Sequence, residues 1–313
     1  MDELKVFSGN AHPALARDIA SYLGQPLGNC EVMEFSNENT FVRILDNVRE
    51  RDVFIVQPIS SPVNSHLMEL LIMIDAVKRA SAKRITAVIP YYAYGRSDRK
   101  DQPRVPITAR LFADLLTVSG ANRVLTVDLH AAQIQGFFNI PVDELTAVYL
   151  LSDYFKKSDF KDLAVVAADI GATKRARDVA SRVNAPLAIM EKRRIGNDDK
   201  TETLNVIGEV DKKTVLIVDD EIDTAGSLMG VTSTLIDRGA REVYACCTHP
   251  IFSGPAVDRI ASSQLKKVVV MDTVPVKDGK IADKVIVLPI APLLGEAIRR
   301  IHTGQSVGAM FER

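Results

Sequence analysis

The stretch Val215-Leu216-Ile217-Val218-Asp219-Asp220-Glu221-Ile222-Asp223-Thr224-Ala225-Gly226-Ser227-Leu228 carries the strongest structural signal in this chain of 313 residues. Its four apolar residues, 215–218, predict a strand that is buried on both faces of a parallel sheet. Asp219 and Asp220 follow at the carboxyl edge of that sheet, where open α/β sheets bind their ligands. The small residues 223–227 then lead into a predicted helix with Leu228 and later apolar residues on one face, which Gly239 can end.

The same stretch predicts a site for a sugar phosphate. A turn of small residues at a helix N-terminus presents backbone N–H groups to a phosphate monoester at the positive end of the helix dipole. The residues of this turn are Asp223, Thr224, Ala225, Gly226 and Ser227. Carboxylates accept hydrogen bonds only, so Asp219 and Asp220 suit vicinal hydroxyls or a magnesium shell. A solvated sheet edge is the alternative interpretation, and the attached turn and helix disfavour it.

Composition limits the class of protein. The chain is 47% hydrophobic and 25% charged, which is typical of a soluble globular protein. Its formal net charge of -1 provides no positive electrostatic field that would attract a polyanion, so we expect no nucleic-acid partner. Its three cysteines, Cys30, Cys246 and Cys247, match neither a disulfide framework nor a zinc spacing, which favours a reducing compartment. We find no signal-peptide core and no apolar stretch of bilayer length, so we expect a cytoplasmic protein without a membrane partner.

Strands and helices alternate along the chain from its beginning. Apolar runs predict strands at 6–7, 53–56, 85–89, 124–127, 165–168, 187–190 and 215–218. Helical spacing of apolar residues follows most of them, for example at Leu111, Leu115 and Val118 before Gly120. This alternation predicts parallel sheets that are covered by helices.

The sequence pattern of the second half repeats that of the first. We pair residues 165–169 with 53–57, 187–190 with 85–89, and 215–219 with 124–128, because each pair combines an apolar run with a polar strand end. This predicts an N-terminal domain of residues 1–147 and a C-terminal domain of residues 148–298. The tail, 299–313, is too apolar to remain in water and is expected to dock back onto the first domain or a neighbouring subunit.

Further candidate groups lie at the predicted sheet edges and in polar loops. His130 follows Asp128 at a strand edge, and with Asp169 it could complete the shell of a magnesium ion that also holds phosphate oxygens. The polar segment 191–200 predicts a mobile loop whose cations could neutralise charge on phosphoryl oxygens, with a solvated hairpin as the alternative. A second basic loop contains Arg96, Arg99, Lys100 and Arg104. Neither a G-x-x-x-x-G-K-[ST] nor a G-x-G-x-x-G motif is present.

Several blocks together resemble the class I phosphoribosyl-pyrophosphate (PRPP) synthetases, or ribose-phosphate pyrophosphokinases. The blocks are 64–74, 85–99, 126–138, 215–228 and 248–256, in matching order over nearly the whole chain. The resemblance implies an α/β fold of two tandem type I phosphoribosyltransferase-like domains. It also implies that the β,γ-diphosphoryl group of MgATP is transferred to the C1 hydroxyl of ribose 5-phosphate, giving PRPP and AMP for nucleotide biosynthesis.

The resemblance also implies residue roles. Lys192 and Arg194 would be catalytic, and His130 and Asp169 would serve Mg²⁺. Ribose 5-phosphate would be held by Asp219, Asp220, Asp223, Thr224, Ala225, Gly226 and Ser227. The co-substrate ATP would be bound by Phe35, Asn37, Asn39, Arg96, Ser97, Asp98 and His130. A regulatory phosphate or ADP would contact Arg49, Arg104 and Ser306. The family assembles as homohexamers built from dimers, with the active site at a subunit interface.

The chain departs from the family pattern at a few positions. Asn37 and Asn39 stand where the family has carboxylates near adenine, and Ser97 stands where it has glutamine, which bears on base selectivity because an amide donates as well as accepts. Ala172 replaces the second glycine of an Asp-x-Gly-Gly turn and could restrict that backbone. Asn47 and Gly308 stand where serines contact the regulatory ligand, which predicts weaker allosteric control.

Two other functions remain open from the sequence. A phosphoribosyltransferase would consume PRPP with a nucleobase or amide, and the second α/β unit disfavours it. A non-catalytic subunit that regulates an active synthetase is favoured by Asn37, Asn39 and Ser97, whereas the intact Lys192 and Arg194 disfavour it. Only a synthetase makes AMP without an added base or partner.

Overall fold

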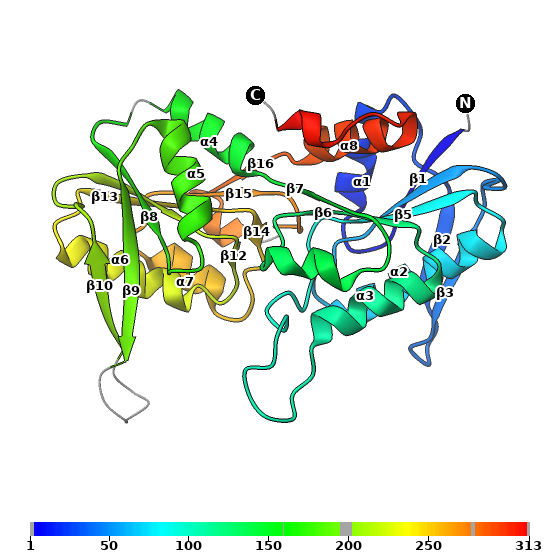
Figure 1. Ribbon diagram of the computed structural model, residues 1–313, viewed down its shortest axis with the longest axis horizontal. Helices are drawn as coiled ribbons and strands as arrows, with labels where there is room; N and C mark the ends of the chain where they lie inside the picture. The colour runs from blue at the N-terminus through cyan, green and yellow to red at the C-terminus, as the bar shows by residue number, and fades with distance from the viewer. Residues whose placement is uncertain (1–2, 159, 195–201, 277–278, 312–313) are drawn as a thin grey trace. The chain divides into compact units, whose positions relative to one another are not determined.

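The chain forms two compact α/β units in the computed structural model, which describes residues 3–158, 160–194, 202–276 and 279–311 (Figure 1). Unit 1 comprises Met1–Leu145, Thr273–Pro275 and Pro289–Arg313, and unit 2 comprises Thr146–Asp272 and Val276–Leu288. The predicted α/β class, with mainly parallel sheets flanked by helices, is confirmed.

Unit 1 is built on a five-stranded parallel sheet with the order β1-β4-β5-β6-β7. These strands are β1 (Leu4–Ser8), β4 (Asp52–Val56), β5 (Arg84–Ile89), β6 (Arg123–Val127) and β7 (Val142–Leu145). The unit also contains α1 (Pro13–Tyr22), α2 (Val63–Arg79), α3 (Thr108–Ser119), η1 (Ala132–Phe137), α8 (Ala291–Thr303) and η3 (Gly308–Met310). Every residue of β4 is buried, as expected for a parallel strand that is covered on both faces.

A second, two-stranded antiparallel sheet belongs to unit 1. It is formed by β2 (Cys30–Glu34) and β3 (Thr40–Ile44), and it was not predicted from the sequence. None of its residues is fully buried, so it lacks the apolar run by which the sheet strands were found. It places the segment Phe35–Asn39 on a turn outside the main sheet.

Unit 2 contains a seven-stranded sheet with the order β10-β9-β8-β11-β13-β15-β16, in which only the β9–β10 pair is antiparallel. Its strands are β8 (Leu163–Ala167), β9 (Leu187–Arg194), β10 (Glu202–Ile207), β11 (Thr214–Val218), β13 (Glu242–Cys247), β15 (Val268–Met271) and β16 (Val285–Leu288). The other elements are α4 (Val148–Lys157), α5 (Thr173–Val183), α6 (Gly226–Asp237), α7 (Ala256–Ser262), η2 (Gly279–Ile281), and the short strands β12 (Glu221–Ile222) and β14 (His249–Pro250).

The two units repeat one plan, but the predicted pairing of their strands was wrong. The order β1-β4-β5-β6-β7 matches β8-β11-β13-β15-β16, and the hairpin β2–β3 follows α1 as β9–β10 follows α5. β11 therefore corresponds to β4 and not to β6. The sequence could not resolve this, because an apolar run followed by a polar residue ends almost every strand of a parallel sheet.

Helix α3 buries a different face from the one that was predicted from the sequence. Phe112 and Leu116 are buried, whereas Leu111, Leu115 and Val118 have exposed fractions of 54%, 39% and 78%. The helix is apolar on both sides, so spacing alone could not select the inward face. Unit 1 therefore presents an apolar stripe to its surroundings.

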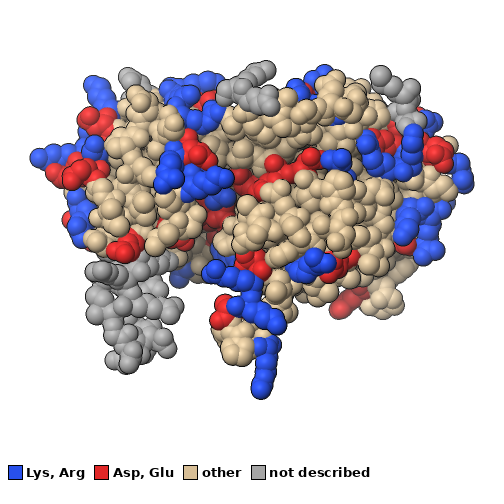
Figure 2. All heavy atoms as spheres, in the orientation of Figure 1, with Lys and Arg blue, Asp and Glu red and all other residues tan. Residues whose placement is uncertain are grey.

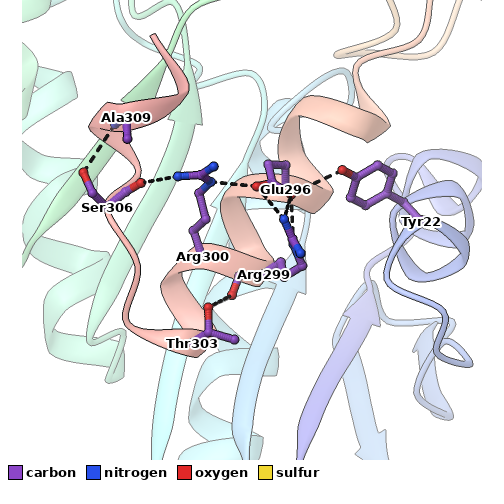
Figure 3. A network of polar contacts seen from close by, with 7 residues as sticks. All are labelled: Tyr22, Glu296, Arg299, Arg300, Thr303, Ser306 and Ala309. Carbon is purple, nitrogen blue, oxygen red and sulfur yellow. Dashed lines mark hydrogen bonds and ion pairs between the residues drawn. The ribbon is translucent and has the colours of Figure 1, made fainter. Parts of the chain in front are cut away.

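The C-terminal helix packs within unit 1 (Figure 3). The Glu296 carboxylate accepts hydrogen bonds from Arg299, from Arg300 Nε at 2.7 Å and from the Tyr22 hydroxyl at 3.3 Å. Arg300 Nη1 also donates to the Ser306 carbonyl at 2.8 Å, which fixes the chain after the helix. Unit 1 begins again at Pro289, whereas the boundary predicted from the sequence lies inside this helix, at residue 299.

Helix α8 is also tied to the strands of unit 1. His302 Nδ1 lies 2.8 Å from Asp52 Oδ2, and Arg84 Nε donates to Asp52 Oδ1 at 2.8 Å. Arg84 Nη2 donates further to the Ile301 carbonyl at 3.0 Å. Asp52 is 4% exposed, so its carboxylate is satisfied by the Arg84 guanidinium and the His302 ring and not by water.

Candidate active site

The carboxyl edge of the unit 2 sheet brings three predicted carboxylates together. β8 and β11 are adjacent parallel strands with Ala167 opposite Val218, so Asp169 and the pair Asp219–Asp220 leave the sheet at the same edge. The charge of Asp169 contributes to raising the pKa of Asp219. This edge is therefore a concentrated acidic site within unit 2.

Asp219 and Asp220 have different environments. Burial raises the pKa of Asp219 well above its ordinary value, and its hydrogen bond with Asp220 and the Asp220 charge add to that shift. Asp220 N donates to Asp219 Oδ1 at 2.9 Å. Arg175 Nη1 lies 3.7 Å from Asp220 Oδ1. A cationic ligand or a hydroxyl donor at this edge would relieve the unfavourable charge on Asp219.

The segment after Asp220 forms the predicted anion-binding turn, residues 223–227, and its backbone geometry suits that role. Ala225 has φ 59°, a left-handed conformation that is uncommon for a residue with a side chain, and α6 begins at Gly226. The N–H groups of Thr224, Ala225 and Gly226 have no acceptor among the residues that the structure describes. Backbone N–H groups gathered at the positive end of a twelve-residue helix suit a phosphate.

Ser253 contacts the same turn, and no role was predicted for it from the sequence. Its hydroxyl hydrogen-bonds to Asp223 Oδ1, and its N–H donates to the Asp223 carbonyl at 3.1 Å. Thirty residues separate the two positions, so no local sequence pattern could indicate the contact.

Lys192 and Arg194 lie on β9 and not in a loop. Their backbones pair with Leu204 and Glu202 of β10 in an antiparallel hairpin, so the loop predicted for 191–200 is wrong for 191–194. The rest of that prediction, 195–200, lies outside the described residues. The backbone therefore supports the hairpin alternative for the arms of this segment.

Four residues of the predicted ATP site gather at the sheet edge of unit 1. Arg96, Ser97 and Asp98 follow β5, and His130 follows β6, its parallel neighbour. Gln133 Nε2 donates to Asp98 Oδ2 at 2.6 Å. A Cβ placed on Gly95 would lie 3.1 Å from His130 Cβ, so the two loops are in close contact.

The other three residues of that group lie on the turn of the β2–β3 hairpin. Phe35 N donates to the Asn39 carbonyl at 2.9 Å, and Asn39 N donates to Asn37 Oδ1 at 3.2 Å. Phe35 is 46% exposed and its ring centroid is 5.6 Å from that of Phe41. The predicted ATP residues are thus divided between the main sheet of unit 1 and this separate hairpin.

The residues predicted to bind a regulatory ligand lie on three segments of unit 1. Arg49 Nη1 donates to the Ser81 hydroxyl at 3.2 Å, and Arg49 N donates to Asn47 Oδ1 at 3.1 Å. The Ser306 hydroxyl accepts from Ala309 N at 3.3 Å. Arg104 is exposed with φ 65° in the segment between β5 and α3 and contacts no other described polar group.

The carboxylates at the carboxyl edge of the unit 2 sheet fit a magnesium ion whose remaining ligands are water molecules and substrate oxygens. No three His, Cys, Asp or Glu side chains of the described ranges form a metal-binding cluster, and Mg²⁺ commonly uses only one or two carboxylates with substrate phosphates. Asp169 is exposed, and its Oδ1 accepts from Ala172 N at 2.9 Å. Ala172 has φ −76°, so the expected restriction of this turn by alanine is absent.

Surface charge is mixed on the face shown in Figure 2, where both basic and acidic side chains lie among larger uncharged areas. The segment between β5 and α3 extends away from unit 1 (Figure 1), and basic side chains lie along it in Figure 2. A hollow of about 290 Å³ lies between α6 and α7 of unit 2, where Arg259 is one of its lining residues.

No helix of the described part of the chain is long and apolar enough to cross a membrane.

Comparison with known proteins gives consistent matches along the chain. Residues 4–120 match the family described as the N-terminal domain of ribose phosphate pyrophosphokinase, and residues 195–312 match the phosphoribosyl synthetase-associated domain. The ribose-phosphate pyrophosphokinase of Oceanobacillus iheyensis is 50% identical over 309 residues, covering 99% of this chain and 97% of that protein. The corresponding enzyme of Clostridium tetani is 51% identical over 312 residues, covering 99% and 97%. The crystal structure of phosphoribosylpyrophosphate synthetase from Mycobacterium smegmatis matches with a TM-score of 0.92 at 41% identity, covering 97% of this chain and all of that one.

Proposed function

This chain belongs to the ribose-phosphate pyrophosphokinase family, and from that membership we propose how its residues divide the work of the reaction. The chain transfers the β,γ-diphosphoryl group of ATP to the C1 hydroxyl of ribose 5-phosphate, and the products are PRPP and AMP. Little covalent chemistry is required of the protein in such a transfer, so positioning and charge stabilisation account for catalysis.

The observation that carries the proposal is the pairing of an N–H-rich turn with carboxylates at one sheet edge. The N–H groups of Thr224, Ala225 and Gly226 lack acceptors among the described residues and would bind the 5-phosphate, together with Asp223 and Ser227. Asp219 and Asp220 would accept hydrogen bonds from the ribose hydroxyls. Binding at both ends of the sugar would orient C1 toward the nucleotide.

Mg²⁺ and ATP complete the proposed site. Asp169 and His130 would serve Mg²⁺, which when bound neutralises charge on the phosphoryl oxygens. Arg96, Ser97, Asp98 and His130, which lie together in unit 1, would bind ATP. Phe35, Asn37 and Asn39 would contact the base. A site completed at a subunit interface would allow this hairpin to contribute to the site of a neighbouring copy.

The β9–β10 hairpin would supply the catalytic cations. Lys192 and Arg194 would neutralise charge that spreads over the transferred oxygens as AMP leaves. A hairpin arm that carries the cations can bring them to the nucleotide without being part of the sugar-binding turn. The strand pairing of both residues supports this arrangement, because it fixes their positions along the arm.

The protein would act as an assembly of several copies. We propose a homohexamer built from dimers, in a cytoplasmic setting. The apolar stripe of Leu111, Leu115 and Val118 on α3 supports an interface between copies, because exposed apolar stripes of this kind mark contact surfaces. Arg49, Arg104 and Ser306 would bind a regulatory phosphate or ADP, with control weakened by Asn47 and Gly308.

The test is an assay of the purified chain alone with ribose 5-phosphate, Mg²⁺ and ATP. Formation of equal amounts of AMP and PRPP is the expected result, and parallel reactions with GTP and CTP measure base selectivity. A chain that makes AMP only after addition of another synthetase would be a regulatory subunit. Repeating the assay with and without inorganic phosphate measures allosteric control.

A further inference from the structure

The predicted anion-binding turn, residues 223–227, and the residues before it accept backbone hydrogen bonds from one segment of unit 2, residues 248–253. The carbonyl oxygen of Asp220 accepts from Thr248 N at 3.0 Å and from His249 N at 2.9 Å. The Ile222 carbonyl accepts from Phe252 N at 3.0 Å, and the Asp223 carbonyl accepts from Ser253 N at 3.1 Å. All of these donors belong to the stretch from the end of β13 to the start of α7.

Arg259 of α7 completes this set. Its Nη1 donates to the carbonyl oxygen of Thr224 at 2.8 Å. A Cβ placed on Gly226 would lie 3.3 Å from the same nitrogen, so the absence of a side chain at 226 leaves room for the guanidinium against the turn. No carboxylate of the described ranges forms an ion pair with Arg259, so none of these residues cancels its charge.

The geometry of the peptide unit gives this contact a consequence for the ligand. The Thr224 carbonyl and the Ala225 N–H belong to one planar trans peptide, in which the two groups point in opposite directions. Fixing the carbonyl toward Arg259 therefore fixes the Ala225 N–H on the opposite side, away from Arg259. A rotation of this peptide would instead turn a partially negative oxygen toward the ligand.

We propose that Arg259 is a positioning residue for the 5-phosphate of ribose 5-phosphate. It acts through the backbone of the turn: it fixes the direction of the Ala225 N–H and adds an uncancelled positive charge behind the anion. The inference rests on the proposed assignment of this turn to the 5-phosphate. It concerns a residue that touches neither substrate nor the reacting atoms.

The test compares Arg259→Gln with the matched variant Arg238→Gln. Arg238 lies at the other end of α6, where its Nη2 donates to Asn205 Oδ1 at 3.2 Å. For Arg259→Gln we expect the KM for ribose 5-phosphate to rise roughly tenfold, as for loss of one charge-assisted hydrogen bond. We expect kcat and the KM for ATP to stay within about twofold, and Arg238→Gln to leave all three within the same limit. Arg259→Lys, which keeps the charge and one donor, should restore most of the affinity.

Calorimetric titration of each variant with ribose 5-phosphate, without ATP, separates this inference from the proposed reaction. A wild-type chain that binds the sugar but makes no AMP would contradict the reaction only. The inference is overturned if Arg259→Gln binds ribose 5-phosphate as tightly as the wild type, or if its loss falls equally on kcat and on the KM for ATP. If Arg259→Gln fails to fold, Arg259→Met takes its place: a roughly tenfold loss of affinity in folded Arg259→Met, with near-wild-type affinity in Arg259→Lys, would support the inference. Unchanged affinity in folded Arg259→Met would overturn it.

Discussion

Asp219 Oδ1 accepts a hydrogen bond of 2.9 Å from the backbone N–H of Asp220, while the Asp220 carboxylate adds its charge to the same small region. Burial is nonetheless the larger cause of the raised pKa of Asp219. The protein thus holds an acidic side chain in surroundings that disfavour its charged form. Such a group costs folding stability and is retained where a ligand needs it.

Asp219→Asn is expected to stabilise the free protein and weaken its substrate binding. A raised pKa means that the contribution of Asp219 to stability is present below the ordinary carboxyl pKa and is lost as pH rises through the raised value. Removing the charge should therefore raise Tm at neutral pH by about 2–4 °C, or about 1 kcal/mol for a protein of this size. Thermal unfolding measures the first effect, and titration with ribose 5-phosphate measures the second. Asp237→Asn, at an exposed position on α6, is the control and should change neither.

Glu296→Gln should loosen the C-terminal helix in a pH-dependent way. Hydrogen bonds from Arg299, and then from Arg300, lower the pKa of Glu296 to about 2 from its ordinary 4.5. Its contribution to stability is present above pH 4.5 and is lost as pH falls toward 2. We expect a loss of about 1 kcal/mol or less at neutral pH, because surface ion pairs contribute little. Urea unfolding at neutral pH and near pH 3 should show the difference shrinking. Glu209→Gln, an exposed control with no polar partner among the described residues, should show no difference at either pH.

Lys192→Ala should remove most turnover while leaving the fold intact. If its ammonium neutralises phosphoryl charge in the transition state, kcat should fall by roughly 100- to 1,000-fold, with a smaller change in the KM for ribose 5-phosphate. The measurement is AMP formation, with circular dichroism to check folding. Lys212→Ala, whose side chain is 89% exposed, should retain full activity. Unchanged turnover in Lys192→Ala would exclude the hairpin from the mechanism.

Val118→Glu should weaken self-association. Val118 is 78% exposed within one chain, so a charge there is tolerated by the isolated subunit but is costly if a second copy covers it. Sedimentation at several concentrations should show smaller assemblies for Val118→Glu. Val118→Thr keeps the shape without adding a charge and should assemble nearly as the wild type does. Equal assembly of all three proteins would place the interface elsewhere.

The elements that were predicted correctly are those with a buried apolar run or a one-sided helix. β11 and the helix after Gly226 are examples, since Val215–Val218 are buried and α6 ends before Gly239. The β2–β3 hairpin was missed because half-exposed strands resemble loops in sequence. The inward face of α3 could not be chosen because apolar residues occur on both sides of it.

The candidate site could be predicted only where its residues are close in sequence. The turn 223–227 and the acidic pair lie in one stretch, so local spacing identified them. Arg259 donates a hydrogen bond to the Thr224 carbonyl although 35 residues separate them in the sequence. The contact depends on how β13 and β14 bring the chain back to the turn. The correspondence between the two units also required the sheet order, which is a property of strand pairing and not of any single strand.

The division of the chain between its units determines the order in which they can be completed during synthesis. Unit 2 is almost continuous, whereas unit 1 needs α8, which packs against Tyr22 and Asp52. As the ribosome releases the chain from its N-terminus, the second unit can therefore finish folding first. The first unit must wait, with part of its apolar interior uncovered, until residue 303 has emerged from the exit tunnel.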